Sequence, residues 1–250
     1  SLNCHRFVPS TESASHTHND REKQIPLKPW ELIGETRTPD GSDMRLTRRD
    51  GEYVIHVNGK TLMSSRLHGS EEELATLACR HVADMDQPHV LVGGLGMGFT
   101  LRSTLDQVAP EATVTVAELV PAVVEWNRGP LGEITGHPLQ DSRVCVEGQD
   151  VALSLRAQPD RFDAIMLDVD NGPTAFTTEE NLDLYGNDGI AAAATALRAG
   201  GVLAVWSAWD DKKFEHRLRY HGFETRAETV RARLKKGGAQ HVIFVGVKAA

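Results

Sequence analysis

The sequence predicts an α/β protein with a mostly parallel, Rossmann-like sheet of seven strands, preceded by a small N-terminal β-meander. Three observations carry this prediction. Apolar strand-like runs alternate with helical segments from residue 69 onward, a glycine turn follows the first of these runs, and the last two runs are joined by a short Lys-Gly-Gly turn that forces an antiparallel hairpin. The chain is accordingly expected to divide into a flexible tail (1–28), a small strand domain (29–68) and a Rossmann-like domain (69–250).

Composition limits the classes of function. A chain of 250 residues with 40% hydrophobic and 25% charged residues is typical of a globular protein with one sizeable domain. The formal charge of −8 argues against a nucleic-acid partner and suits a cationic substrate. The sequence shows no apolar run near the roughly 20 residues of a membrane span and no basic-then-apolar leader. Three widely spaced cysteines suggest neither disulfides nor zinc, so a cytoplasmic location without membrane contact is expected.

The N-terminal part contains hairpin signals. Residues 1–28 are polar and aperiodic, as in a flexible tail. Short strands are expected from Trp30 to Ser65, because Asp50-Gly51 and Asn58-Gly59 separate alternating runs, and such pairs favour tight hairpins. The predicted strands include Glu31–Arg37, Met44–Arg49 and Glu52–Val57.

The rest of the chain alternates between helices and strands. Ser70–Val82 is predicted to be a helix, with a capping box from Ser70 to Glu73. Gly200-Gly201 is expected to cap the Ala-rich helix. The other expected strands are Val90–Val92, Thr113–Glu118, Val144–Glu147, Phe162–Asp168, Val202–Trp206, Phe223–Val230 and His241–Val247, and the other helices are Met97–Val108, Pro121–Asn127, Val151–Arg156, Gly189–Arg198 and Lys212–Tyr220. This is the layout of the class I S-adenosylmethionine methyltransferase fold.

The glycine turn is the first candidate site. Gly94-x-Gly96-x-Gly98 links the strand at Val90–Val92 to the next helix. Glycines allow the backbone to turn tightly and a ligand to lie against it, while the helix start directs free N–H groups at that ligand. Alone, the turn predicts a nucleotide-type ligand without specifying which.

The residues at the ends of the following strands indicate which nucleotide-type ligand binds. Glu118 lies about twenty residues beyond the turn, where a carboxylate binds ribose hydroxyls. Glu147-Gly148 can accept a hydrogen bond from an adenine amino group, and Asp168 and Asp170 follow the fourth strand. Any one acid could be a solvated strand end. Four strand ends with suitable groups in this order predict an adenosyl cofactor.

From about Leu32 to Ala250 the chain resembles the spermidine synthase (polyamine aminopropyltransferase) family. The resemblance rests on the N-terminal meander, on Gly-Gly-x-Gly-x-Gly-x-Thr-Leu-Arg, on Glu118 before Pro121, on Glu147-Gly148, and on Phe162–Asp168 with Gly172-Pro173. It implies transfer of an aminopropyl group from decarboxylated S-adenosylmethionine to a diamine, with release of methylthioadenosine. It also implies a homodimer, which would cover exposed edges of the meander.

The resemblance implies roles for the two aspartates. Asp168 matches the family's catalytic aspartate, and Asp170 is a candidate second carboxylate for the amine. An amine in water is mostly protonated, with a pKa near 10 by analogy with lysine, and a carboxylate can orient it and accept its proton. A sulfonium leaving group needs no metal, and we expect none.

Several positions depart from the family pattern. Met97 stands in the glycine turn where the family has an acid for the donor's ammonium. In the stretch after the hairpin, Leu62, Leu67-His68 and Glu71 replace a glutamine, an Asp-Glu pair and a tyrosine of the family. The loop from Asp168 to Gly172 is about two residues shorter than in the family. The cofactor half therefore matches well and the amine half poorly.

Met97 leaves the donor undecided. Loss of the acid removes a repulsion against the carboxylate of intact S-adenosylmethionine, which could favour that cofactor. Alternatively, Met97 packs under the helix and another acid binds the ammonium. Trp206 to Asp211 and Tyr185 are candidates for the wall of a cation pocket, although ordinary packing explains them equally well.

The leading hypothesis is a spermidine-synthase-like transferase that moves an alkyl group from an adenosyl sulfonium to a small amine. The alternative on the same fold is an S-adenosylmethionine-dependent methyltransferase, motivated by Met97. A third is a non-catalytic adenosyl-nucleotide-binding protein, against which the intact Asp168 argues.

Overall fold

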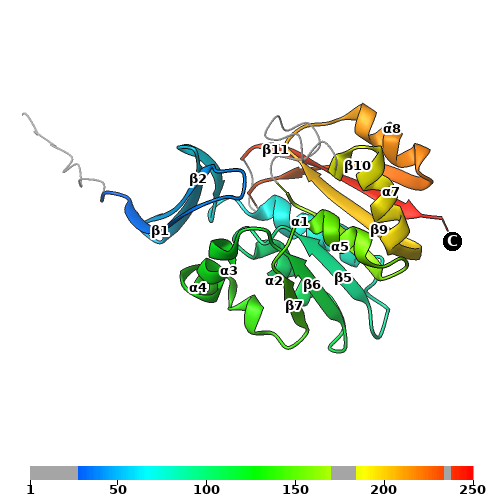
Figure 1. The fold of residues 1–250 in the computed structure, drawn as a ribbon, viewed down its shortest axis with the longest axis horizontal. Helices are drawn as coiled ribbons and strands as arrows, with labels where there is room; N and C mark the ends of the chain where they lie inside the picture. The colour runs from blue at the N-terminus through cyan, green and yellow to red at the C-terminus, as the bar shows by residue number, and fades with distance from the viewer. Residues whose placement is uncertain (1–27, 170–183, 234–237, 250) are drawn as a thin grey trace, which may run out of the picture.

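The computed structural model describes residues 28–169, 184–233 and 238–249 and contains two sheets. A four-stranded antiparallel sheet lies at one end of the molecule, and a seven-stranded sheet with helices forms the rest (Figure 1). This confirms the predicted α/β class and its N-terminal meander. The tail expected at 1–28 lies, except for its last residue, outside the described residues.

The N-terminal sheet has the order β1-β2-β3-β4, and its hairpins follow from turn residues. Asp50 and Gly51 have φ of 49° and 79°, and Asn58 and Gly59 have φ of 49° and 76°. Two consecutive positive φ values give the type I′ turn that matches strand twist. The strands are β1 (Glu31–Arg37), β2 (Asp43–Arg49), β3 (Glu52–Val57) and β4 (Lys60–Ser64).

The large sheet has the order β10-β11-β9-β8-β5-β6-β7. The five strands from β9 to β7 in this order are parallel, and β10 and β11 form an antiparallel hairpin, as the sequence predicted. β11 also pairs antiparallel with β9. The strands are β5 (His89–Gly93), β6 (Thr113–Ala117), β7 (Val144–Glu147), β8 (Phe162–Leu167), β9 (Leu197–Ser207), β10 (Phe223–Arg231) and β11 (Gln240–Lys248).

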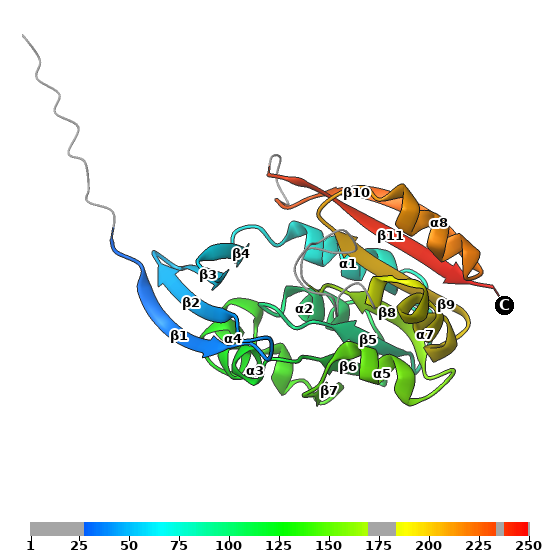
Figure 2. The same cartoon turned by 45° about the horizontal axis from the view of Figure 1, so that its top comes forward.

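Helices cover both faces of this sheet (Figure 2). Along β8, Ala164 and Met166 face one apolar layer, whereas Ile165 and Leu167 face the other, because successive strand residues point to opposite sides. Helices α1, α2 and α3 pack in the first layer, and α5, α7 and α8 in the second. The helices are α1 (Gly69–Cys79), α2 (Phe99–Leu105), α3 (Pro121–Arg128), α4 (Pro130–Thr135), α5 (Val151–Ala157), α7 (Asn187–Ala196) and α8 (Lys212–Tyr220), with a 3₁₀ turn at Pro138–Gln140.

Two predicted helix ends were wrong. Helix α1 begins at Gly69 with His68 as its N-cap and has no side-chain cap, so Ser70 does not form the expected capping box. The Ala-rich helix ends at Ala196, and Gly200-Gly201 lies within β9 instead of capping the helix. Leu197 already pairs with Phe162 of β8, so strand β9 begins before the two glycines.

The N-terminal sheet packs against the glycine-turn side of the large domain. A Cβ added to Gly34 would lie 2.4 Å from Nε1 of Trp126, so this β1 position has room only for glycine against α3. Met63 of β4 contacts the turn itself, where a Cβ on Gly96 would lie 3.0 Å from its Cε. The meander therefore covers the turn from outside.

Candidate active site

The candidate site lies where the strand order reverses. β5 has β6 on one side and β8 on the other, and a ligand of a doubly wound sheet binds beyond the carboxyl ends of such strands. The chain after β8 stays joined to β5, because the Asp168 amide donates to the Gly93 carbonyl at 3.0 Å. The Glu118 amide likewise donates to the Glu147 carbonyl at 3.0 Å. The predicted strand-end residues in the described ranges thus line one edge.

The glycine turn needs its glycines for both conformation and space. Gly94, Gly96 and Gly98 have φ of 87°, 50° and 85°. A Cβ on Gly94 would lie 2.5 Å from the carbonyl oxygen of Asp168. Asn127 of α3, which was not predicted as a site residue, fixes the turn by donating from Nδ2 to the Gly96 carbonyl at 2.8 Å.

Glu118 is held at the base of the turn. Its side chain is buried, with Oε2 accepting from the Leu95 amide at 2.9 Å and Oε1 from the Val120 amide at 2.8 Å. These two amide donors fix the orientation of the carboxylate. The position fits the expected role with ribose hydroxyls.

Glu147 has strong protein partners of its own. Arg161 donates to its Oε1 at 2.8 Å, and Ser154 and Gln149 donate to its Oε2. Beside it, a Cβ on Gly148 would meet no heavy atom within 4 Å, so the space next to this backbone is open. Arg161 thus fixes the Glu147 carboxylate, which the sequence assigned to adenine, next to the open space at Gly148.

Asp168 is the half-buried acid at the end of β8. It follows Met166 by two residues and faces the same layer, toward α2, where Thr100 Oγ1 donates to its Oδ2 at 3.2 Å. Burial raises the pKa of Asp168 to about 6, and the Thr100 hydrogen bond acts in the opposite direction. A carboxyl with a pKa near neutrality can both accept and return a proton.

The chain beside Asp168 is anchored by Tyr185. Its hydroxyl donates to the Val169 carbonyl at 2.9 Å, while its ring packs edge-on to Phe214 at 6.0 Å. Tyr185 is therefore a buried residue that anchors the chain after β8. Asp170, the second predicted catalytic residue, lies outside the described residues, as do Gly172 and Pro173.

Sequence reasoning missed a polar cluster on the other side of Asp168. Glu71 and Ser70, in the first turn of α1, are both buried, and Ser70 Oγ donates to Glu71 Oε2 at 2.7 Å. His241 of β11 lies with Nδ1 3.0 Å from the same hydroxyl, and Trp206 of β9 contacts the His241 ring edge-on at 4.6 Å. Glu71 was recognised only as a departure from the family, since nothing in a helix-start glutamate predicts burial.

Other departures have structural explanations. Met97 is 1% exposed and belongs to the apolar cluster under α2, so its side chain packs in the core. His68 stacks on Phe99 at 4.1 Å and pairs with Glu72 at 2.7 Å. Met97 as a cofactor contact stays a prediction, and an acid for a substrate ammonium must come from elsewhere.

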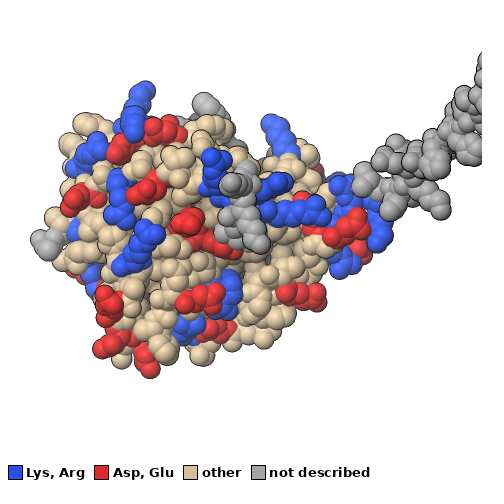
Figure 3. Space-filling model, turned by 180° about the vertical axis from the view of Figure 1, so that it is seen from behind, with Lys and Arg blue, Asp and Glu red and all other residues tan. Residues whose placement is uncertain are grey.

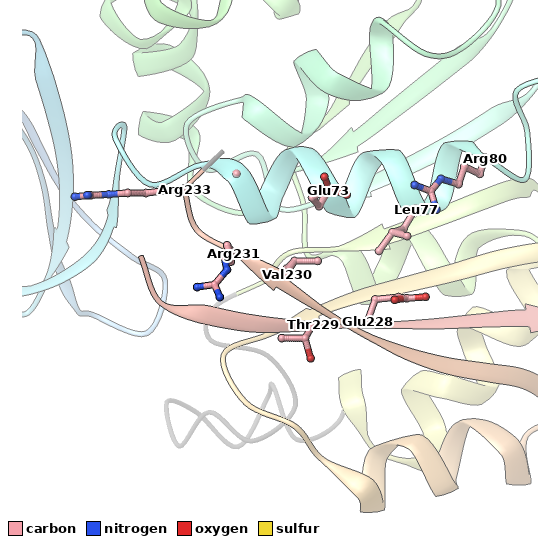
Figure 4. A pocket seen from close by; sticks show the side chains of 9 residues that line it. Glu73, Leu77, Arg80, Glu228, Thr229, Val230, Arg231 and Arg233 are labelled. Carbon is pink, nitrogen blue, oxygen red and sulfur yellow. The ribbon is translucent and has the colours of Figure 1, made fainter. Parts of the chain in front are cut away.

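A separate hollow of about 440 Å³ lies between α1 and the edge strand β10 (Figure 4). Glu73 and Arg80 of α1 and Glu228 of β10 line it, so charges of both signs meet there. Glu73 follows Glu71 by two residues, and a helix turns by about 200° over two residues. The hollow therefore lies on the opposite side of α1 from the candidate site.

The surface of the molecule carries charges of both signs. Basic and acidic side chains are interspersed on the face drawn in Figure 3, and the N-terminal sheet pairs them, as in Arg48–Glu31 at 2.9 Å. Within the described ranges, no group of three or more His, Cys, Asp or Glu residues is arranged to hold a metal. No helix in the same ranges is long and apolar enough to span a membrane.

Comparisons with known proteins agree with this geometry. No family model matches the chain. It is 31% identical over 163 residues to the polyamine aminopropyltransferase of Mycobacterium tuberculosis, covering 64% of this chain and 30% of that protein. The chain thus spans about 30% of the length of this curated relative.

Solved structures share the fold at lower identity. Spermidine synthase from Thermotoga maritima superposes with a TM-score of 0.67 at 18% identity, covering 87% of this chain and 72% of that one. A spermidine synthase in complex with the transition-state analogue AdoDATO gives a TM-score of 0.66 with the same identity and coverage. The expected fold is therefore confirmed.

Proposed function

Because 64% of this chain is related in sequence to the polyamine aminopropyltransferase, or spermidine synthase, family, we propose that it is an aminopropyltransferase. It moves the aminopropyl group of decarboxylated S-adenosylmethionine to a small amine. The observation that carries the proposal is the position of Asp168, a half-buried acid that touches the glycine turn through the close approach of its carbonyl to Gly94.

Different residues of the chain bind different parts of the donor. The turn from Gly94 to Gly98 offers backbone against which an adenosyl group can lie, and Glu118 is oriented by two amide donors to accept ribose hydroxyls. The edge beside Glu147 and Gly148 takes the adenine. Asn127 and Met63 keep the turn in place from two sides.

The reaction is a substitution at carbon. The amine nitrogen attacks the propyl carbon bound to sulfur, a C–N bond forms, the C–S bond breaks, and its electron pair neutralises the sulfonium as a thioether. An ammonium has no free pair, so the attacking nitrogen must first lose a proton, which Asp168 accepts and passes to solvent. A pKa near 6 makes Asp168 largely ionised at neutral pH and therefore able to take that proton.

Methyl transfer from intact S-adenosylmethionine is a second candidate, motivated by Met97. The glycine turn has no carboxylate at this position to repel the donor's own carboxylate. On this alternative the same nitrogen attacks the methyl carbon, and S-adenosylhomocysteine is the product.

The experiment is to incubate the protein with each donor and the diamine putrescine, and to identify the nucleoside product by mass spectrometry. Methylthioadenosine with an aminopropylated amine is the expected result. S-adenosylhomocysteine would establish the methyltransferase instead. Absence of both products across a panel of amines, despite donor binding, would leave a non-catalytic binding protein.

The other expectations concern organisation and surroundings. The small strand domain (29–68), the Rossmann-like domain (69–250), a cytoplasmic location and a homodimer stay predictions. Within the described ranges, β1 and β4 are the edges of the N-terminal sheet. An exposed sheet edge is a natural place for a second copy to pair.

A further inference from the structure

Glu71 is a buried carboxyl that the donor site does not use. It lies in the first turn of α1 and is 8% exposed, and Ser70 beside it is fully buried. Glutamate is rarely buried unless it is paired or has a task. The partner here is a neutral hydroxyl, since Ser70 Oγ donates to Glu71 Oε2 at 2.7 Å.

The groups that act on the Glu71 carboxyl supply no positive charge. Asp168 faces it from β8 and repels it, Glu72 on the same helix adds a weaker repulsion, and His241 of β11 reaches it only through Ser70. Burial lowers the pKa of His241, which keeps that ring neutral. Burial first, and repulsion by Asp168 second, raise the pKa of Glu71 to about 8. At neutral pH the two carboxyls therefore hold one proton between them.

The position of Glu71 separates it from the donor. The residues assigned to the donor follow β5, β6 and β7, on one side of β8 in the sheet order. Glu71, His241 and Trp206 belong to α1, β11 and β9, on the other side. Asp168, at the end of β8, lies between the donor residues and the Glu71 group. This is where the donor and the acceptor amine of a transfer reaction would meet.

The surroundings of Glu71 suit an alkylammonium group. The His241 ring lies against Ser70, the neighbour of Glu71, and Trp206 packs on that ring; aromatic faces attract cations. The indole N–H of Trp206 is buried, and no hydrogen-bond partner for it occurs in the described ranges. Two neighbouring carboxyls that share one proton are stabilised by a ligand that brings a positive charge.

Building on the proposed function, we propose that Glu71 and Asp168 form a carboxylate pair that binds an ammonium group of the acceptor amine. Glu71 is the acid that selects a cationic acceptor, and Asp168 is the acid next to the reacting carbon. When the ammonium binds, Glu71 gives up its proton to solvent and both carboxylates become ionised against the cation. Charge is balanced, because one proton leaves as one ammonium charge enters the acidic pair.

The test is calorimetric titration of putrescine into the full chain at neutral pH, with methylthioadenosine present, in buffers of different ionisation enthalpy. The buffer dependence of the heat gives the number of protons released. We expect release approaching one proton per putrescine in the wild type and none in Glu71→Gln, which mimics the protonated acid. Loss of a charge-assisted contact of about 1.5–3 kcal/mol should weaken putrescine binding roughly 10- to 150-fold.

The control variants keep the test decisive. Glu73→Gln, on the far side of α1, should bind putrescine and release protons as the wild type does. Glu71→Asp should restore part of the proton release, and thermal unfolding confirms that each variant is folded. Affinity for decarboxylated S-adenosylmethionine should stay within about twofold in Glu71→Gln, because Glu71 lies outside the donor half.

The outcomes separate this proposal from the proposed function. Wild-type protein that binds donor, but takes up putrescine without proton release or equally well as Glu71→Gln, overturns the carboxylate pair alone. Wild-type protein that binds no donor overturns the proposed function, while proton release on putrescine binding would still support the pair.

Discussion

The hydroxyl of Thr100 donates to Oδ2 of Asp168 at 3.2 Å and so joins the first turn of α2 to the end of β8. One helical turn further, Thr104 lies 3.7 Å from the sulfur of Met166. Residues four apart on a helix thus match residues two apart on a strand, because both spacings are about 6 Å. This register holds the acid of the candidate site beside the glycine turn that precedes the helix.

Thr100→Val should shift the pH dependence of transfer. The Thr100 hydrogen bond lowers the pKa of Asp168, so its removal raises that pKa further above its ordinary value. If the ionised form of Asp168 accepts the proton, the acid limb of the rate profile moves to higher pH. A hydrogen bond of about 0.5–1.5 kcal/mol corresponds to a shift of roughly 0.4–1.1 pH units.

The matched control is Thr104→Val, which touches Met166 and the Thr100 carbonyl but not the acid. Its pH profile should coincide with that of the wild type even if its stability falls. Equal shifts in both variants would mean that the helix packing, and not the hydrogen bond to Asp168, sets the profile.

Asp168→Asn should abolish most turnover while leaving the donor bound. An amide has the shape of the acid but accepts no proton from the attacking nitrogen, and acid–base catalysis contributes typically about 10²–10⁴-fold. Donor affinity measured by calorimetry should stay within a few-fold. Asp106→Asn, an exposed acid on the same side of the sheet, is the control. A variant Asp168→Asn with wild-type turnover would remove Asp168 from the mechanism.

Gly94→Ala should lose stability and donor binding together. Gly94 has φ of 87°, and its Cβ would lie 2.5 Å from the Asp168 carbonyl oxygen. Gly41→Ala is the control, since Gly41 has φ of 85° but no neighbour within 4 Å. Urea unfolding should show a cost of about 1–2 kcal/mol for the control and more for Gly94→Ala. Similar costs in the two variants would show that the turn tolerates the methyl group.

Stability should fall between about pH 4.5 and about pH 8 because of Glu71. Its folded-state pKa of about 8 exceeds the ordinary value of 4.5, so the folded state binds more protons than the unfolded state in this interval. The free energy of unfolding therefore decreases as pH rises, by about 1.4 kcal/mol for each unit of pKa difference.

Glu71→Gln removes this dependence and should be the more stable protein at alkaline pH, on the order of a few kcal/mol. Urea titrations across the interval measure the difference, with Glu73→Gln following the wild-type curve. Parallel curves for the wild type and Glu71→Gln would contradict the buried, protonated state of Glu71.

The fold was predictable because its signals are local. Asp50-Gly51 and Asn58-Gly59 dictate type I′ turns whatever surrounds them, and apolar runs alternating with helices permit few arrangements. The helix end predicted at Gly200-Gly201 was wrong because Leu197 already pairs with β8, and a contact between such distant segments is not visible in the local sequence. Helix α4 follows Gly129 and starts at Pro130, a common first helical residue, and was missed because the segment is short.

The proposed donor half of the site could also be predicted from strand ends, since Gly94, Glu118 and Asp168 each follow a strand that the alternation reveals. The amine half could not. Glu71 is one of three consecutive glutamates, and only packing of α1 over the sheet decides that this one is buried while Glu73 lines a hollow on the far side. Its relation to His241 joins residues far apart in the chain.

Side-by-side calorimetric titration of decarboxylated and intact S-adenosylmethionine into the wild-type chain tests the central claim most directly. The account predicts one site per chain, with tighter binding of the decarboxylated donor, because Asp168, which lies beside the glycine turn and is largely ionised at neutral pH, repels the carboxylate that the intact donor keeps. Tighter binding of the intact donor, or no binding of either, would contradict it.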